Sequence, residues 1–210
     1  MTSHPKDLSE KLTDTIAAHP KVCEHIHLPL QSGSDNILKK MNRGYTSGDY
    51  LKLTEGIRER IPEASITTDL IVGFPTETEG DFERTLEMVK EVRFDSAFMF
   101  RYSVREGTKA ALLDDNLPEE EKLRRLHLLI DLQKEISGEK NARLVGKTLE
   151  VLVDDRSRRT PGRWKGKTRT NKTVVLEGDE DVLGEIVPVT INEADGFTLF
   201  GKQQERVHAG

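Results

Sequence analysis

Residues 65–72 have the sequence SITTDLIV, a run that is rich in β-branched residues and becomes apolar toward its end. Such a run is typical of a strand buried in a parallel sheet, and the Gly-Phe-Pro that follows at residues 73–75 ends it. A helical pattern then begins at Thr78, with Asp81 three residues later where a capping box places its acidic side chain. This stretch therefore predicts one strand-helix unit of an α/β fold.

Two similar units flank this stretch. Strands are predicted at residues 25–30 (HIHLPL) and 95–100 (DSAFMF), so that strands recur at roughly 30-residue spacing. Helical patterns lie around them, at residues 8–18, 34–41, 46–61 and from Pro118 to about residue 136. Three repeats of this kind predict right-handed βαβ units and a parallel sheet, which is part of a barrel because three strands do not close one. We therefore interpret the chain as a fragment.

The hydrophobic period changes from 3.6 to 2 beyond Arg143. Short strands are predicted at residues 148–153, 173–176, 184–191 and 197–200, with Gly, Asp and Asn turns between them. That pattern is typical of a small all-β barrel. We predict two domains, a partial (βα) barrel at residues 1–142 and a β domain at residues 143–210.

Charge is distributed unevenly along the chain. The net charge is −5, yet residues 156–172 contain eight Lys or Arg and no Asp or Glu, which leaves 24 basic against 37 acidic side chains elsewhere. A basic segment on an acidic body favours a polyanionic partner. No apolar run approaches the roughly 18 residues of a membrane span, so no membrane partner is expected. The single cysteine, Cys23, excludes an intrachain disulfide and fits the cytoplasm.

The predicted strand exits carry polar side chains. In parallel α/β barrels, ligands bind in the loops at the carboxyl ends of the strands. These loops contain Gln31 and Ser32, then Gly73, then Arg101 and Tyr102. Gly73 leaves room for a flat ligand, and Tyr102 with two arginines, Arg101 and Arg105, suits an anionic or nucleotide-like one. Each loop also has an interpretation without a ligand: a capped turn for the first, a strand stop for the second, and solvated loop charges for the third.

The basic segment, residues 156–172, also contains the only tryptophan of the chain, Trp164. Lysine and arginine neutralise phosphates, and an indole face stacks on an unpaired base. On a small β barrel this combination favours single-stranded or looped RNA. The alternative is a solvated basic hairpin with Trp164 in a local core. The predicted RNA-binding residues are Arg156, Arg158, Arg159, Arg163, Trp164, Lys165, Lys167, Arg169 and Lys172.

Neither the histidines nor the cysteine indicates a metal site. His25 and His27 alternate on one strand, but no cysteine or carboxylate lies at metal-ligand spacing from them. Cys23 has no second cysteine beside it, and we expect it to be an ordinary buried thiol. No metal ligand and no catalytic residue is therefore predicted in this fragment.

Several segments together resemble the radical S-adenosylmethionine methylthiotransferases, most closely the MiaB type. The matching segments are residues 2–7 (TSHPKD), 27–34 (HLPLQSGS), 41–45 (MNRGY), 68–78 (TDLIVGFPTET) and 94–103 (FDSAFMFRYS), and a TRAM-like domain at about residues 143–207. The resemblance implies the C-terminal half of a radical SAM partial (βα) TIM-like barrel, followed by an OB-like TRAM barrel.

The resemblance also implies a function and cofactors. Members of the MiaB type are tRNA-modifying enzymes that methylthiolate C2 of N(6)-isopentenyladenosine beside the anticodon, with S-adenosyl-L-methionine and two 4Fe-4S clusters. By position, Gln31 and Ser32 match the pocket for the methionine end of S-adenosylmethionine, and Asp69, Ile71 and Gly73 match the strand along its adenine and ribose. Arg101 and Tyr102 would line the same cavity. The TRAM-like basic residues and Trp164 would hold the tRNA anticodon stem-loop.

The departures from the family limit that expectation. A four-iron cluster needs three thiolates from the chain, and this chain has one cysteine. We therefore expect the fragment alone to be inactive and its clusters to come from a missing N-terminal half. Two alternatives remain: a RimO-type enzyme, which modifies an aspartate of a ribosomal protein, and a non-catalytic RNA-binding remnant. Val104, Glu106 and Thr76 stand where the family often has Pro, Pro and Gly.

Overall fold

The computed structural model describes residues 4–157, 162–178 and 181–204. The chain divides into two compact units, residues 1–136 and 137–210, and each unit is described by itself. The division falls inside helix α5 (Glu119–Ala142), which continues from one unit into the other. The predicted domain boundary at residues 142–143 stays a prediction.

The first unit contains a three-stranded parallel sheet in the order β1 (His25–His27), β2 (Ser65–Val72) and β3 (Ser96–Arg101). Strand β1 pairs with β2 from His25 opposite Ser65, and an isolated bridge between Gln31 and Leu70 continues the pairing. Asp69 lies opposite Phe98 and Ile71 opposite Phe100 in the β2–β3 pair. The predicted parallel α/β fold is confirmed.

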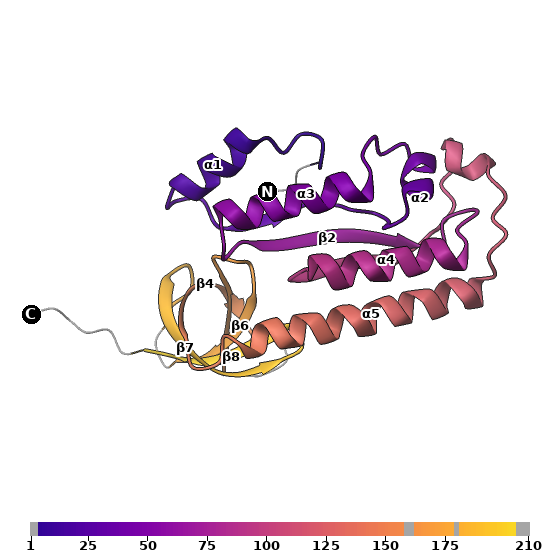
Figure 1. Cartoon of the computed structure of the whole chain (residues 1–210). Helices are drawn as coiled ribbons and strands as arrows, with labels where there is room; N and C mark the ends of the chain where they lie inside the picture. Colours follow the sequence, from indigo (N-terminus) through magenta and orange to yellow (C-terminus); the bar gives the residue numbers. More distant parts are fainter. Residues whose placement is uncertain (1–3, 158–161, 179–180, 205–210) are drawn as a thin grey trace, which may run out of the picture. The chain divides into compact units, whose positions relative to one another are not determined.

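Helix α1 (Glu10–Ala18) precedes β1, and helices α2 (Asp35–Lys40), α3 (Ser47–Arg60) and α4 (Glu79–Val92) lie between the strands in sequence. The short helix η1 (Lys109–Leu112) follows β3 and precedes α5. Figure 1 shows α3, α4 and α5 running alongside β2. The predicted capping box is confirmed: the Asp81 amide donates to Thr78 Oγ1, and the Thr78 amide donates to Asp81 Oδ2. Helix α3 begins with an equivalent box formed by Thr46 and Asp49.

The two faces of the sheet differ in burial. Strand residues such as Ile66, Leu70 and Val72 are buried in one core with side chains from α3, α4 and α5. The next residues along each strand point to the opposite face because side chains alternate along a strand. On that face Phe98 and Phe100 remain 61% and 52% exposed. Two exposed aromatic side chains mark this face as a surface for binding rather than for packing within this unit.

The second unit contains a closed five-stranded barrel in the order β4-β5-β6-β8-β7. Its strands are β4 (Thr148–Arg156), β5 (Trp164–Thr168), β6 (Thr173–Glu177), β7 (Ile186–Asp195) and β8 (Thr198–Gln203). The inward side chains form one core, including Val151, Val153, Val174 and Leu199. The predicted small all-β barrel is confirmed, although β5 was not expected as a strand.

Strand β5 pairs closely with β4 because Gly166 has no side chain. A Cβ at Gly166 would lie 2.4 Å from the Leu152 carbonyl oxygen. Burial along β5 alternates, with Trp164, Gly166 and Thr168 inward and Lys165 and Lys167 outward. The run of charges at residues 156–172 hid this alternation in the sequence. In the part of the chain that the structure describes, no helix is both long and apolar enough to cross a membrane.

Candidate cofactor cavity and nucleic-acid interface

A cavity of about 660 Å³ lies at the carboxyl ends of the three parallel strands. Five of the seven predicted cofactor-binding residues line it: Gln31, Asp69, Ile71, Arg101 and Tyr102. They come from three different strand exits, which places them together at one edge of the sheet. A volume of this size fits an organic cofactor or a nucleotide. The structure therefore supports one shared binding cavity rather than three separate capped loops.

Gln31 is fixed at the cavity by the backbone. Its φ is 73°, its amide donates to the Asp69 carbonyl at 2.8 Å, and its own carbonyl accepts from the Ile71 amide at 2.9 Å. A left-handed φ is uncommon for a residue other than glycine and occurs where the surroundings enforce it. The two hydrogen bonds supply that constraint here. Gln31 is thereby held against the two β2 residues that also line the cavity.

Ser32 lies outside the cavity wall. It is fully buried, its Oγ lies 3.4 Å from Thr85 Oγ1, and it accepts a hydrogen bond from the Ser34 amide at 3.2 Å. The Gly33 amide also donates to Thr85 Oγ1, at 3.0 Å. Ser32 therefore anchors the turn after β1 to helix α4. Its side chain faces Thr85 and the Ser34 amide, and it does not line the cavity in which a cofactor contact was expected.

Gly73 also lies outside the cavity wall, and its lack of a side chain has a different cause from the one expected. Its φ is +71°, and a Cβ there would lie 2.5 Å from Lys122 Cγ. The space above Gly73 is thus filled by the aliphatic part of Lys122, not left open for a flat ligand. The Gly73 amide donates to Glu77 Oε1 at 2.9 Å, which fixes the exit of β2.

Asp69, a predicted wall residue, is bonded to a histidine that the sequence did not assign to the site. His27 Nε2 lies 3.3 Å from Asp69 Oδ1, and His27 Nδ1 lies 3.0 Å from Thr67 Oγ1. Both contacts follow from the strand register, since His27 lies opposite Thr67 and Asp69 is two residues further along β2. The alternation of His25 and His27 was the signal available in the sequence. Asp69 keeps 29% of its side chain exposed, so its second oxygen can accept from a ligand.

Tyr102 presents an unsatisfied polar atom beside the cavity. Its ring packs edge-on against Phe74 with centroids 5.3 Å apart, and Lys122 Nζ lies 5.9 Å from the ring centroid. Its Oη is buried and has no hydrogen-bond partner among the described residues. A buried hydroxyl without a partner costs about 1–3 kcal/mol. A polar ligand atom in the cavity would relieve that cost.

Tyr45, on the loop that leads into α3, is held through its hydroxyl. Tyr45 Oη donates to the carbonyls of Pro29 and Leu30, each at 3.0 Å. Burial raises the pKa of Tyr45 to about 12, although the charge of Arg43 opposes the shift. Tyr45 therefore stays a neutral donor at physiological pH. It ties the segment at residues 41–45 to the exit of β1.

The exit of β2 is held from outside the cavity by a buried ion pair. Arg125 Nη1 donates to Glu77 Oε1 at 2.7 Å, and the two side chains are 4% and 1% exposed. Burial raises the pKa of Glu77 above its ordinary value, and the hydrogen bonds from Gly73 and Arg125 oppose that shift. Arg125 also pairs with Glu79 and Glu121. Helix α5 thus clamps the loop that carries Phe74 into the cavity.

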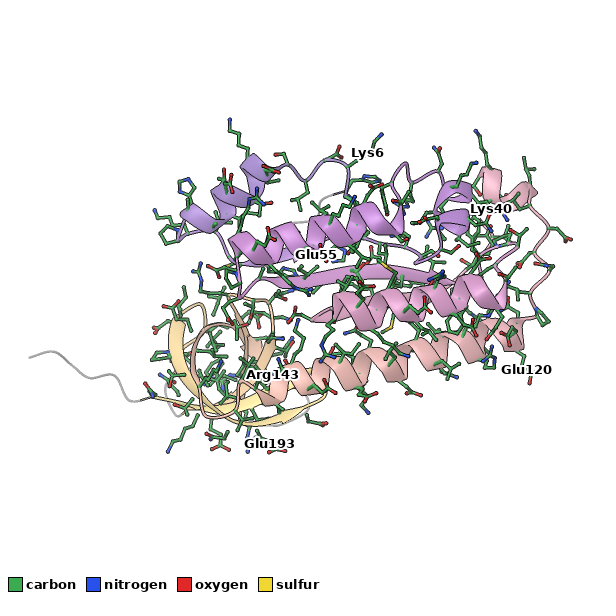
Figure 2. The ribbon with its side chains drawn as sticks, viewed as in Figure 1. Lys6, Lys40, Glu55, Glu120, Arg143 and Glu193 are labelled. Carbon is green, nitrogen blue, oxygen red and sulfur yellow. The ribbon has the colours of Figure 1, made fainter. Side chains whose placement is uncertain are left out.

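Sequence reasoning found two of the basic side chains around the cavity, Arg101 and Arg105, and missed the others. Lys40, Arg43, Arg105 and Lys109 line it together with Arg101. Figure 2 labels Lys40, which lies at the end of helix α2. The segment that contains Arg43 was noticed only for its resemblance to a family. We call these five residues the cationic rim.

Trp164 does not offer a stacking platform, which corrects that expectation. Its side chain lies in the barrel core and the residue is 3% exposed. The Arg156 guanidinium covers its ring, with Cζ 3.9 Å from the ring centroid. The alternation along β5 explains this placement, because every second side chain of a barrel strand points inward. The alternative of Trp164 in a local core is the one that the structure shows.

The outward basic side chains of the barrel remain candidates for phosphate binding. Lys165 and Lys167 point outward from β5 and are half-buried. Burial and the neighbouring charge of Lys165 lower the pKa of Lys167, and its Nζ donates to Thr173 Oγ1 at 2.9 Å. The remaining predicted residues fall into three groups: the exposed Arg156; the paired or bonded Arg163, Arg169 and Lys172; and Arg158 and Arg159, which lie outside the described residues.

Cys23 is exposed, so the expectation of a buried thiol is wrong. It precedes β1 in a stretch without helix or strand, which is why no core forms around it. Within residues 4–157, 162–178 and 181–204, no group of three or more His, Cys, Asp or Glu side chains is placed to hold a metal ion.

Comparisons with known proteins agree with the two units. Residues 1–89 match the radical SAM superfamily, and residues 142–203 match the TRAM domain. The chain is 52% identical over 200 residues to a Carboxydothermus hydrogenoformans protein named tRNA-2-methylthio-N(6)-dimethylallyladenosine synthase. It is 50% identical over 202 residues to a protein of the same name from Alkaliphilus oremlandii. These matches cover 95% and 96% of the chain but 46% and 43% of the relatives, so the chain spans less than half of their length.

A solved structure supports the fold of the first unit. The radical SAM enzyme coproporphyrinogen III oxidase from Escherichia coli superimposes with a TM-score of 0.54 over 65% of this chain and 32% of its own. The identity is 23%, so the likeness concerns the fold alone. It agrees with the predicted partial radical SAM barrel.

Proposed function

Since this chain joins a radical SAM region to a TRAM domain and is a homologue of tRNA methylthiotransferases, we propose that it is part of an enzyme that methylthiolates N(6)-dimethylallyladenosine in tRNA. One structural observation carries the proposal. The exits of three parallel strands converge on one cavity. The closed barrel with outward lysines in the same chain adds independent support. The cavity suits a cofactor and an extruded base, and the barrel suits an RNA backbone.

S-adenosylmethionine fits the cavity by the chemistry of its wall. Asp69 offers a carboxylate oxygen to ribose hydroxyls, while Ile71 offers apolar surface to an adenine. Gln31 is fixed beside them, and Tyr102, whose buried Oη has no partner among the described residues, lines the same cavity. When bound, this cofactor supplies the methyl group and the radical precursor of the chemistry. The residues of this chain bind it, orient it and exclude water from it.

Iron-sulphur clusters do not fit the residues of this chain. Cys23 is its single cysteine, and a four-iron cluster requires three thiolates. We infer that the cluster ligands belong to residues outside these 210, in the part of the relatives that the chain does not match. No step of the reaction is assigned to a cluster held by this chain.

We place the enzyme in the cytoplasm, where tRNA is modified.

The RNA-binding part of the proposal rests on the outward face of β5. Lys165 and Lys167 point outward from β5, and Arg163 immediately precedes the strand. Cations that follow one another in this way suit successive phosphates of an anticodon stem-loop. The buried Trp164 takes no part in base stacking. Phosphate contacts of this kind position a nucleic acid without reading its sequence. The choice of the modified adenosine therefore belongs to the cavity.

A hybrid protein, in which this chain replaces the matching part of a relative, tests the proposed function. The matching 46% of the Carboxydothermus hydrogenoformans relative is exchanged for this chain, and the hybrid is expressed in cells that lack their own tRNA methylthiotransferase. We expect 2-methylthio-N(6)-dimethylallyladenosine in digested tRNA by mass spectrometry, and its loss in the Asp69→Ala hybrid. Glu55→Ala, on helix α3, is the control that should keep the product. A folded hybrid that loads its clusters but leaves tRNA unmodified would contradict the proposal.

A further inference from the structure

The charge of the cavity exceeds what a single cofactor molecule needs. The cationic rim contributes five basic side chains, whereas Asp69 is the acidic residue of the wall. The rim comes from three segments: the end of α2 and the loop after it, the exit of β3, and η1. Clustered cations repel one another unless anions lie between them. A carboxylate of one small molecule would satisfy one or two of the five.

The five cations differ in what they already bind. Arg101 Nη1 pairs with Glu119 Oε2 at 2.7 Å, and Lys40 Nζ donates to Thr76 Oγ1. Arg43, Arg105 and Lys109 form no ion pair with any residue that the structure describes. Arg105 and Lys109 are exposed, and Arg43 is half-buried. Three cations at one cavity therefore remain available to a ligand.

We propose that Arg43, Arg105 and Lys109 bind phosphodiester groups of a single-stranded RNA loop whose unpaired base enters the cavity. The inference rests on the proposed function and adds a second RNA contact to it, on the first unit. Several phosphates in a row match several separate cations, which one carboxylate does not. Phe100 lies on the same wall and is 52% exposed, so that an aromatic face is open to an unpaired base.

The geometry also selects a loop over a duplex. A cavity of about 660 Å³ admits a base that has left its stack, whereas the bases of a duplex are stacked and paired. The cations of the rim come from three separate segments rather than from one strand. Their arrangement fits a backbone that bends around an extruded nucleotide. The barrel lysines, by contrast, lie along one strand and suit either form of RNA.

The test uses the full chain and two RNA probes: a hairpin with a single-stranded loop, and a blunt duplex of the same stem. The rim variant is Arg43→Ala with Arg105→Ala and Lys109→Ala. The matched control removes three exposed lysines from helices α1, α4 and α5: Lys11→Ala, Lys90→Ala and Lys134→Ala. Fluorescence anisotropy is recorded over a series of salt concentrations, because the salt slope counts neutralised phosphates.

We expect the rim variant to bind the hairpin at least tenfold more weakly. The slope of log affinity against log salt concentration should be smaller by about 2, because each of three lost phosphate contacts contributes about 0.7. Its affinity for the duplex should stay unchanged, and so should both affinities of the control. A charge-keeping variant, Arg43→Lys with Arg105→Lys and Lys109→Arg, should regain most of the hairpin affinity. Equal losses on both probes, or no loss on the hairpin, would overturn the inference.

These outcomes are separable from failure of the proposed function. If the rim variant binds the hairpin with wild-type affinity while the wild-type chain binds RNA through β5, only the assignment of the rim is contradicted. If the wild-type chain binds neither probe, both fall together.

Discussion

Glu77 shows how a single residue couples the cavity to the stability of the fold. Its Oε1 accepts from Gly73 and Arg125, and its Oε2 is buried without a partner among the described residues. A buried carboxylate without full hydrogen bonding is costly, which is why its pKa is raised. The pair positions the β2 exit rather than adding net stability, since buried ion pairs gain little over apolar packing.

The raised pKa of Glu77 gives a pH dependence with a definite sign. Between the ordinary value of 4.5 and the raised pKa, the folded chain holds a proton that the unfolded chain releases. The free energy of unfolding therefore falls as the pH rises through that window. We expect Glu77→Gln to remove this component, measured as the difference from wild type in urea unfolding at several pH values. Arg125→Met should enlarge it, because a stabilising cation is lost.

An identical pH profile for wild type and Glu77→Gln would contradict this assignment. The matched control is Glu83→Gln on the exposed side of α4, which should leave the profile unchanged.

At the scale of elements, the charge of strand β5 could be predicted from the sequence, whereas its pattern of burial could not. Lys165 and Lys167 alternate with the inward Trp164, Gly166 and Thr168, so that one strand serves both the core and the basic surface. Its charge pattern is visible in the sequence. Its burial pattern is not, because lysine on one side and glycine on the other give no hydrophobic signal of period two.

The basic face of β5 should carry RNA affinity. We expect Arg163→Ala with Lys165→Ala and Lys167→Ala to weaken binding of a tRNA anticodon stem-loop and to reduce the salt slope by about 2–3. The control is Lys147→Ala with Lys202→Ala, which removes exposed cations outside β5. Anisotropy titrations check both. Unchanged affinity and slope in the β5 variant would defeat the assignment.

The elements of the first unit were predictable because their signals are local. Thr78 and Asp81 marked the start of α4, and the β-branched run at residues 65–72 marked β2. The cavity was predictable in part, since parallel strands place their exits at one edge. The places of Ser32 and Gly73 outside the cavity could not be predicted. Their packing partners, Thr85 and Lys122, lie 53 and 49 residues further along the chain. The cationic rim joins loops that are equally remote in sequence.

At the scale of the whole molecule, the uncovered face of the sheet is the feature that most affects behaviour in solution. Phe98 and Phe100 lie on it, opposite Asp69 and Ile71 of β2. Large exposed aromatic side chains at a sheet edge favour association. The charge of the remaining surface keeps the chain soluble without covering this face.

We therefore expect the isolated chain to bind a hydrophobic dye and to self-associate at high concentration. Phe98→Thr with Phe100→Thr should reduce both, with little loss of stability because the two rings are more than half exposed. Dye fluorescence and analytical ultracentrifugation measure the two effects. Leu112→Thr, an exposed apolar residue of η1, is the control. A strictly monomeric wild-type chain that leaves the dye dark would speak against this account.

Taken together, the two proposals assign one tRNA two binding places on this chain, the cationic rim and the outward face of strand β5. The most direct test is a photo-crosslinking map with a tRNA anticodon stem-loop that carries a photoreactive base at the modified position, read by mass spectrometry of the peptides. The account predicts crosslinks from the photoreactive base to residues of the cavity wall, such as Phe100 or Arg105, and their loss when unlabelled stem-loop competes. Crosslinks confined to the helical surface of α1 and α4, with none at the cavity, would contradict it.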